Sequence, residues 1–220
     1  MKKIIFISTT ILLSVFSFSQ MPEKFVKAME ARVPAVDTVY TVDGLTELAN
    51  AFERIAEAEK NQWLPYYYAA FCNAQAGLMM GGGNIMAGSP EKTDPIADKA
   101  EKLLNKAEEL NKDNSEIFIV KKMILTLRML GDAMNRYMIY GPEAAAALEK
   151  AKTLNPENPR VYLLEAQDKF HTPEQFGGSK AEAKVLFETA VKKYEAFKLE
   201  SSIHPSWGMG QAKYYLSQMQ

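Results

Sequence analysis

The residues that could do chemistry are few and lie far apart along the 220-residue chain. There are two histidines, His171 and His204, and a single cysteine, Cys72. The H-E-x-x-H, C-x-x-C, P-loop and G-x-S-x-G patterns, which assemble metal ligands, phosphate-binding groups or nucleophiles, do not occur. Either histidine could serve as a ligand or a base, but a histidine at a loop surface is the simpler interpretation of both. We therefore predict that the protein is not an enzyme and that it carries no metal and no cofactor.

Two glycine-rich stretches invite comparison with anion-binding loops. The first, Gly81-Gly82-Gly83-Asn84, is followed by a helix that we expect to begin only around Asp94, whereas a phosphate loop leads directly into a helix N-terminus. It is predicted to be a flexible connection. The second, Phe176-Gly177-Gly178-Ser179, does enter a helix directly and is followed by Lys180, so it is the better anion candidate. A tight entry to that helix explains its glycines equally well without a ligand.

Composition excludes some classes of partner. The chain is 47% hydrophobic and 24% charged, with a net charge of −1, so it has no basic surface for nucleic acid or an anionic membrane. Cys72 has no partner for a disulfide within the chain, and its neighbours Ala69-Ala70-Phe71 indicate a buried structural thiol. Stability must therefore come from packing.

The first nineteen residues read as a secretory leader. Lys2-Lys3 forms the positive region, Ile4 to Phe18 is largely apolar, and Ser17 and Ser19 provide the small residues of a cleavage site before Gln20. The apolar stretch is shorter than the roughly 20 residues that span a bilayer, and no cysteine follows for a lipid anchor. We predict a signal peptide over 1–19, export to the periplasm or beyond the cell, and one helical domain over 20–220 without a membrane span.

The elements that must position any site are revealed by an internal repeat. A three-residue pattern recurs along the chain: an alanine, a large apolar residue four positions later, and a second small residue three positions after that. Two copies end in similar turns, Leu110 to Asn114 and Leu154 to Asn158. Asn114 and Asn158 are 44 residues apart. The copies are Ala100/Leu104/Ala107, Ala144/Leu148/Ala151, Ala183/Phe187/Ala190 and the degenerate Leu48/Phe52/Ile55.

This pattern resembles the second helix of the tetratricopeptide repeat (TPR) family, in which small residues let the two helices of a hairpin approach closely. The resemblance implies an all-α solenoid of about four helical hairpins. The units exceed the usual repeat of about 34 residues. We assign the excess to three loops between paired helices, over 80–90, 131–142 and 171–179.

Local signals set the expected helix boundaries. Ser179 with Glu182 forms a capping box, and Asp94-Pro95 and Gly141-Pro142 are expected to open second helices. A last helix over 207–219 is expected to cap the array.

If the resemblance holds, the first helices line a concave groove. Carried onto this sequence, its binding residues would be Leu64, Tyr67, Phe71, Ile119, Met123, Arg160, Leu163, Gln167 and Phe170. This set is largely apolar and lacks the Lys/Asn/Arg carboxylate clamp of chaperone-tail-binding TPR proteins. Such a groove suits a hydrophobic peptide or small molecule. Alternatively, the N-terminal helix or the loops fill it.

Two functions remain open on the sequence alone. The first is a TPR-type scaffold that binds a protein or peptide partner in the bacterial envelope. The second is a periplasmic carrier of an apolar small ligand, similar to the TPR component of tripartite solute transporters. An enclosed apolar cavity would favour the carrier and an open groove the scaffold, and we take the scaffold as the main hypothesis.

Overall fold

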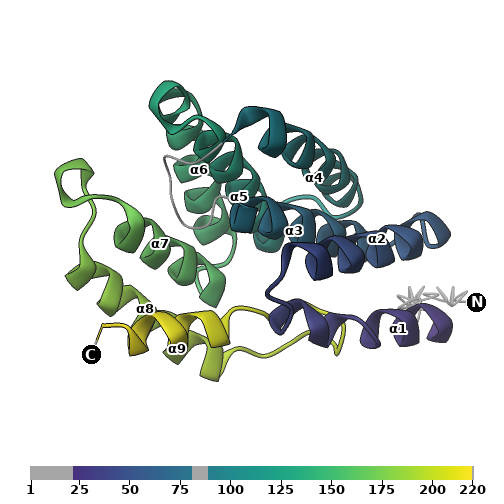
Figure 1. Ribbon diagram of the computed structural model, residues 1–220. Coiled ribbons are helices and arrows are strands. Elements are labelled where there is room, and N and C mark those ends of the chain that lie inside the picture. Colours follow the sequence, from purple (N-terminus) through teal and green to yellow (C-terminus); the bar gives the residue numbers. More distant parts are fainter. Residues whose placement is uncertain (1–21, 81–88, 220) are drawn as a thin grey trace, which may run out of the picture.

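A computed structural model of the chain describes residues 22–80 and 89–219, and every regular element in these ranges is helical (Figure 1). The all-α class is therefore confirmed. The predicted leader over 1–19 and the glycine-rich stretch 81–84 lie outside the described residues. The elements are α1 (Glu23–Glu30), the 3-10 helix η1 (Val33–Asp37), α2 (Val42–Ala58), α3 (Trp63–Met80), α4 (Pro90–Leu110), α5 (Ser115–Gly131), α6 (Ala133–Leu154), α7 (Pro159–His171), the 3-10 helix η2 (Glu174–Phe176), α8 (Lys180–Ala196) and α9 (Met209–Ser217).

Consecutive helices pack as neighbours, most extensively α5 with α6, α2 with α3, α3 with α4, and α7 with α8. The repeated alanines lie at these contacts, as Ala151 illustrates. Its side chain is completely buried, and its carbonyl oxygen accepts a hydrogen bond of 2.9 Å from the Ser115 hydroxyl on α5. A methyl group is all that the narrow gap between α5 and α6 admits.

The two repeated asparagines act as N-caps, which is why their turns recur. The Asn114 side chain accepts a hydrogen bond from the backbone N–H of Glu116 at 2.8 Å, and that of Asn158 from the N–H of Arg160 at 3.0 Å. Each satisfies a backbone donor that the helix itself leaves free. Ser179 caps α8 in the same way through the N–H of Glu182, as its capping-box pattern predicts.

Two predicted helix starts are wrong. α4 begins at Pro90 rather than at Asp94, and α6 begins at Ala133 and runs through Pro142 rather than beginning there. A proline removes one backbone donor from a helix, but here contacts with neighbouring helices hold it together. Arg136 at the start of α6 makes two hydrogen bonds to the Asp94 carboxylate on α4, of 2.6 and 2.8 Å. The segment predicted as a loop over 131–142 is therefore mostly the first half of α6.

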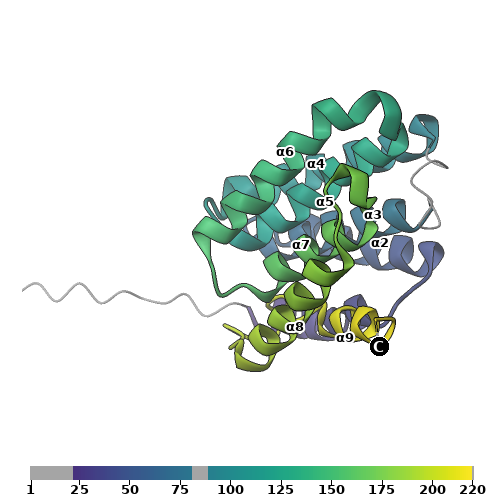
Figure 2. The ribbon, with the colours of Figure 1, turned by 90° about the vertical axis from the view of Figure 1, so that its left-hand side faces the viewer.

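The first and last helices of the described chain lie along one side of the helical array, α1 at the lower right and α9 at the lower left of Figure 1, and the segments next to them are in contact. The backbone N–H of Gly208 donates to the Asp37 carboxylate at 2.9 Å. The last helix begins at Met209, two residues later than predicted, because Gly208 has a φ of 109° that a helix cannot continue. Turned by 90°, the molecule shows α6, α7 and α8 following one another from top to bottom (Figure 2).

Candidate functional site

The structure brings the nine predicted groove residues onto α3, α5 and α7, but most of them are inaccessible. Seven have buried side chains, while Gln167 and Phe170 are half-buried. The buried members are Leu64, Tyr67, Phe71, Ile119, Met123, Arg160 and Leu163. In this conformation the six residues other than Arg160 form part of the hydrophobic core rather than an open groove.

The C-terminal segment from 197 to 219 covers this face. The rings of Trp207 and Phe71 lie 4.4 Å apart between centroids, and the Trp207 indole N–H donates to the Tyr67 hydroxyl at 2.9 Å. Farther along, the Phe170 ring contacts that of Tyr215 on α9 at 5.2 Å. The segment that covers these residues is therefore the C-terminal one, and not the N-terminal helix or the inter-helix loops of the expected alternative. Ligand binding by these nine residues stays a prediction.

The contacts of Arg160 indicate a structural role. Its guanidinium is fully buried and donates to Glu116 at 2.9 Å and to the carbonyl oxygen of Pro205. The rings of Phe197 and Trp207 lie 5.4 and 5.2 Å from it. Because a buried charge must be paired to be tolerated, Arg160 ties the C-terminal segment to α5 and α7.

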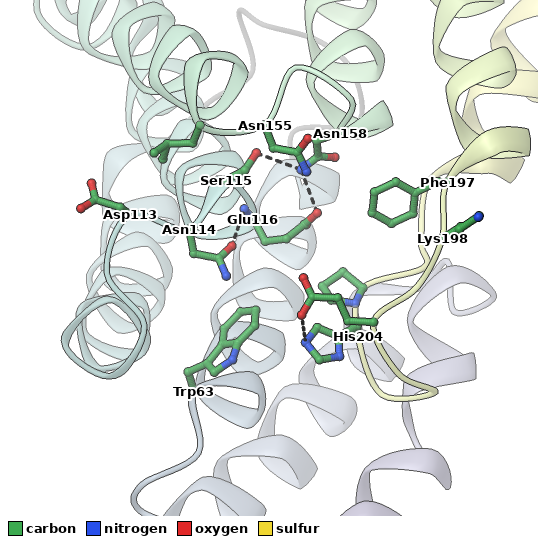
Figure 3. A pocket seen from close by; sticks show the side chains of 13 residues that line it. Trp63, Asp113, Asn114, Ser115, Glu116, Asn155, Asn158, Phe197, Lys198 and His204 are labelled. Atoms are coloured by element: carbon green, nitrogen blue, oxygen red, sulfur yellow. Dashed lines mark hydrogen bonds and ion pairs between the residues drawn. The ribbon is translucent and has the colours of Figure 1, made fainter. Parts of the chain in front are cut away.

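A pocket of about 280 Å³ opens above this network, between Trp63, Phe197 and His204 (Figure 3). Its lining is mainly polar, and several of its polar groups, including His204, already have partners within the chain. The Nδ1 atom of His204 lies 2.7 Å from the Ser201 hydroxyl, and its Nε2 atom lies 3.1 Å from the Glu200 carboxylate. Burial lowers the pKa of His204, against the opposing charge of Glu200. This pocket therefore offers a ligand little apolar surface and no free imidazole nitrogen.

A second pocket, of about 320 Å³, lies between α6 and the segment formed by α7 and η2, and we call it the α6–α7 cleft. More of its lining is apolar than polar. α6 contacts α7 far less than it contacts α5, which leaves this side of the helix open. The lining residues are Tyr137, Ala145, Leu148, Glu149, Lys152, Glu165, Asp168, Lys169, Thr172, Phe176 and Gly177.

The α6 wall of the cleft continues as an exposed apolar stripe. Tyr137, Ala145 and Leu148 recur at helical spacing, and Met134 and Met138 fall on the same stripe at the start of the helix. The side chains of Met134, Tyr137 and Met138 are 80%, 52% and 79% exposed. Clustered exposed apolar side chains of this size mark a binding surface more often than scattered ones do.

The opposite wall carries Phe176, whose side chain is 66% exposed. The turn behind it is tightly constrained. Gly177 adopts a φ of 94°, and a Cβ on Gly178 would lie 1.7 Å from the carbonyl oxygen of Thr172. The Lys169 ammonium group donates to the Gly177 carbonyl at 3.3 Å. The glycines noted in the sequence as a candidate anion loop therefore serve to hold an aromatic ring at the edge of the cleft.

The remaining chemical candidates lie elsewhere. The His171 Nε2 atom is 2.9 Å from the Tyr215 hydroxyl, and burial lowers the pKa of His171. Cys72 is buried, which raises the pKa of its thiol well above the ordinary range and agrees with the structural interpretation. In residues 22–80 and 89–219, no three His, Cys, Asp or Glu side chains are placed to hold a metal ion. No helix in the same ranges has the length and apolar character needed to cross a bilayer.

Comparison with known proteins bears on the two functional hypotheses. No protein-family profile matches the chain, and no curated protein matches it. Among solved structures, the chain is similar to the HusA haemophore from Porphyromonas gingivalis, with 34% sequence identity and a TM-score of 0.76 over 89% of this chain and 92% of that one. The chain belongs to the HusA haemophore family.

Membership of the HusA family overturns the main hypothesis from the sequence. The prediction of a scaffold that mediates protein–protein interaction is wrong, and the alternative, a small-ligand carrier, is the better supported. The resemblance to TPR proteins is not settled by this similarity and stays a prediction, because no family profile matches.

For this member of the HusA family, sequence reasoning missed the walls of the α6–α7 cleft. Gly131 and Gly141-Pro142 led us to assign the intervening residues to a loop, although they are helical. A signal was present: Asp132 is a good N-cap residue, and its carboxylate accepts from the N–H of Asn135. With the helix started there, Met134, Tyr137 and Met138 fall on one face.

Proposed function

We propose that this protein is an exported carrier that binds haem. The observation that carries the proposal is the 34% identity and TM-score of 0.76 to the HusA haemophore over nearly the whole of both chains. A haemophore captures haem, so its binding surface must accept a planar, mostly apolar ring that bears two carboxylates. The protein is proposed to act without catalysis, as a carrier requires no reaction.

The α6–α7 cleft suits such a ligand better than the pocket above Arg160. Tyr137 and Phe176 present exposed rings from its two walls, and aromatic rings stack favourably on other flat π systems. The cleft of about 320 Å³ is at the small end of the range for ligand pockets, about 300–1,000 Å³. The stripe at Met134 and Met138 extends its apolar wall, so a ring could be held partly outside the pocket itself.

The proposed carrier would hold haem by stacking and apolar contact rather than through a histidine. Haem iron is commonly held by His, Cys, Met or Tyr. Neither histidine lines the cleft. The Nε2 atom of His171 is engaged by Tyr215, both ring nitrogens of His204 are engaged by Ser201 and Glu200, and Cys72 is buried. The capture surface is therefore the α6 stripe and Phe176.

The proposal includes two further features that the sequence predicts, export and a relationship to TPR proteins. We propose that the leader over 1–19 directs export to the periplasm or beyond it and is removed before Gln20. We also propose that the helical pairs are lengthened TPR units. The asparagine caps at Asn114 and Asn158 and the buried repeat alanines support that relationship.

A titration with haemin tests the function. The protein over 20–220 is titrated with haemin while the Soret absorbance and the fluorescence of its two tryptophans are followed. We expect a saturable change with one haem per chain and a dissociation constant of about 1 μM or lower, equivalent to roughly 8 kcal/mol or more of binding free energy. A change that rises linearly without saturation, matched by a non-binding control protein, would overturn the proposal.

A further inference from the structure

The proposed function gives no role to the charged residues that line the α6–α7 cleft. Its two cations are Lys152 on α6 and Lys169 on α7, each with a side chain 36% exposed. The Lys152 ammonium group lies 3.3 Å from the Glu165 carboxylate across the cleft. The Lys169 ammonium group lies 2.7 Å from Glu182, whose side chain is 61% exposed.

The lining also carries three carboxylates, those of Glu149, Glu165 and Asp168, and Glu165 is the present partner of Lys152. Asp168 is engaged by Lys122, a side chain only 5% exposed, at 2.5 Å, so its charge is neutralised from the core side. Glu149 lies on the exposed face of α6, three residues before Lys152. Partly exposed ion pairs such as those of Lys152 and Lys169 contribute little stability, so a ligand carboxylate can replace their present partners at small cost.

Lys152 and the exposed apolar side chains of α6 occupy different parts of the cleft. Tyr137 precedes Lys152 by fifteen residues, which is about 22 Å along the axis of α6. Helical side chains lean toward the N-terminus, so the long Lys152 stem reaches back toward Leu148 and shortens this separation. Along α6, the cleft thus changes from exposed apolar side chains at the start of the helix to the Lys152–Glu165 ion pair near its end, and Lys169 lies on α7 beside the Gly177 carbonyl.

We propose that the cleft binds its ligand in one orientation, with the carboxylate edge against Lys152 and Lys169 and the apolar edge against Tyr137 and Met138. This inference rests on the proposed haem-carrier function and adds a substrate class to it: planar tetrapyrroles that bear free carboxylates, in preference to neutral analogues. Hydrogen bonds from ammonium groups to carboxylates are stronger than those between neutral groups, which gives the selection its physical basis.

The first test compares haemin with its dimethyl ester, which retains the ring and the iron and loses both negative charges. Each is titrated into the wild type, Lys152→Met, Lys169→Met and the control Lys150→Met. Lys150 is on the same helix but pairs with Asp113 at 3.4 Å and does not line the cleft. We expect each cleft variant to bind haemin about threefold to tenfold more weakly, with ester binding and the Lys150→Met control unchanged.

A second kind of variant is expected to raise the affinity for haemin instead of lowering it. Glu165→Gln removes the present partner of Lys152, so it should bind haemin about twofold to fivefold more tightly and leave ester binding unchanged. A merely structural role of this ion pair would not produce a gain in affinity.

The outcomes separate the two proposals. Equal affinity of the wild type for haemin and the ester, with the lysine variants unchanged, would overturn the orientation and leave the carrier function standing. Failure of the wild type to bind haemin at all would overturn both.

Discussion

The position of Phe176 contributes little to the stability of the fold. Its ring is two-thirds exposed, yet the backbone behind it uses a positive φ at Gly177 and a contact at Gly178 too close for any side chain. Folding alone gains little from presenting an exposed aromatic ring on a constrained turn, because apolar burial is what stabilises folded chains. A rigid ring is useful to a flat ligand, since the protein loses little conformational freedom when it binds.

The substitution Phe176→Ala separates this role from folding. We expect a change in unfolding free energy within about 0.5 kcal/mol, because the side chain is exposed. Haemin affinity should fall about threefold to tenfold, which corresponds to the 0.5–1.5 kcal/mol typical of a stacked aromatic pair. The measurements are haemin titration and urea denaturation.

The control for Phe176→Ala is Val185→Ala on α8, an equally exposed apolar residue at 61% that does not line the cleft. Its haemin affinity should match the wild type. If Phe197→Ala weakened binding while Phe176→Ala did not, the site would be the pocket above Arg160 instead.

At the scale of the helices, the small repeat residues are the main constraint on packing. Ala151 is completely buried at the contact between α5 and α6, and replacing it by leucine would add three heavy atoms where the helices already touch. We expect Ala151→Leu to lower the unfolding free energy by about 1–3 kcal/mol, the usual cost of overpacking. Lys150→Leu, one position earlier on the exposed side of α6, should stay within about 0.5 kcal/mol. Equal denaturation midpoints for the two variants would contradict the packing shown by the structure.

Elements with strong local signals were predictable, and those held by distant contacts were not. The helix starts at Asn114, Asn158 and Ser179 can be predicted from the sequence, because an N-cap hydrogen bond joins residues no more than three positions apart. The start of α6 was mispredicted because Gly141-Pro142 is a strong local breaker. The Arg136–Asp94 contact that helps to hold the helix there joins residues 42 positions apart. The cleft was missed for the same reason, since its first wall is this part of α6.

Across the whole molecule, the largest gap in the sequence interpretation is the cover over the predicted groove. Periodicity identifies Tyr67 and Phe71 as facing one side, but it cannot tell that Trp207 will pack on them from 136 or more residues away. Because the predicted groove is filled, the ligand site that we propose is the α6–α7 cleft. In the helical array, the C-terminal segment covers the residues that were predicted to form a scaffold's binding groove.

The cover also gives the molecule a predictable response to acid. His171 contacts Tyr215 of α9, and His204 sits in the turn that leads to Trp207, so both histidines hold the C-terminal segment in place. Burial lowers the pKa of both below the ordinary value of about 6.5. The unfolded chain therefore binds these protons more readily than the folded one. Their contribution to stability is complete above pH 6.5 and is lost as the pH falls below it.

We expect the urea midpoint of the wild type to decrease between pH 7.5 and pH 5.5, and the decrease to be smaller in the double variant His171→Gln/His204→Gln. The double variant is needed because Asp37 acts in the opposite direction. Burial raises the pKa of its carboxyl group, despite the Gly208 hydrogen bond and the charge of Arg160, so its contribution grows as the pH falls. Comparing the two proteins over the same pH interval removes the Asp37 contribution and leaves that of the histidines. An identical decrease in both proteins would mean that protonation of His171 and His204 does not loosen the C-terminal segment.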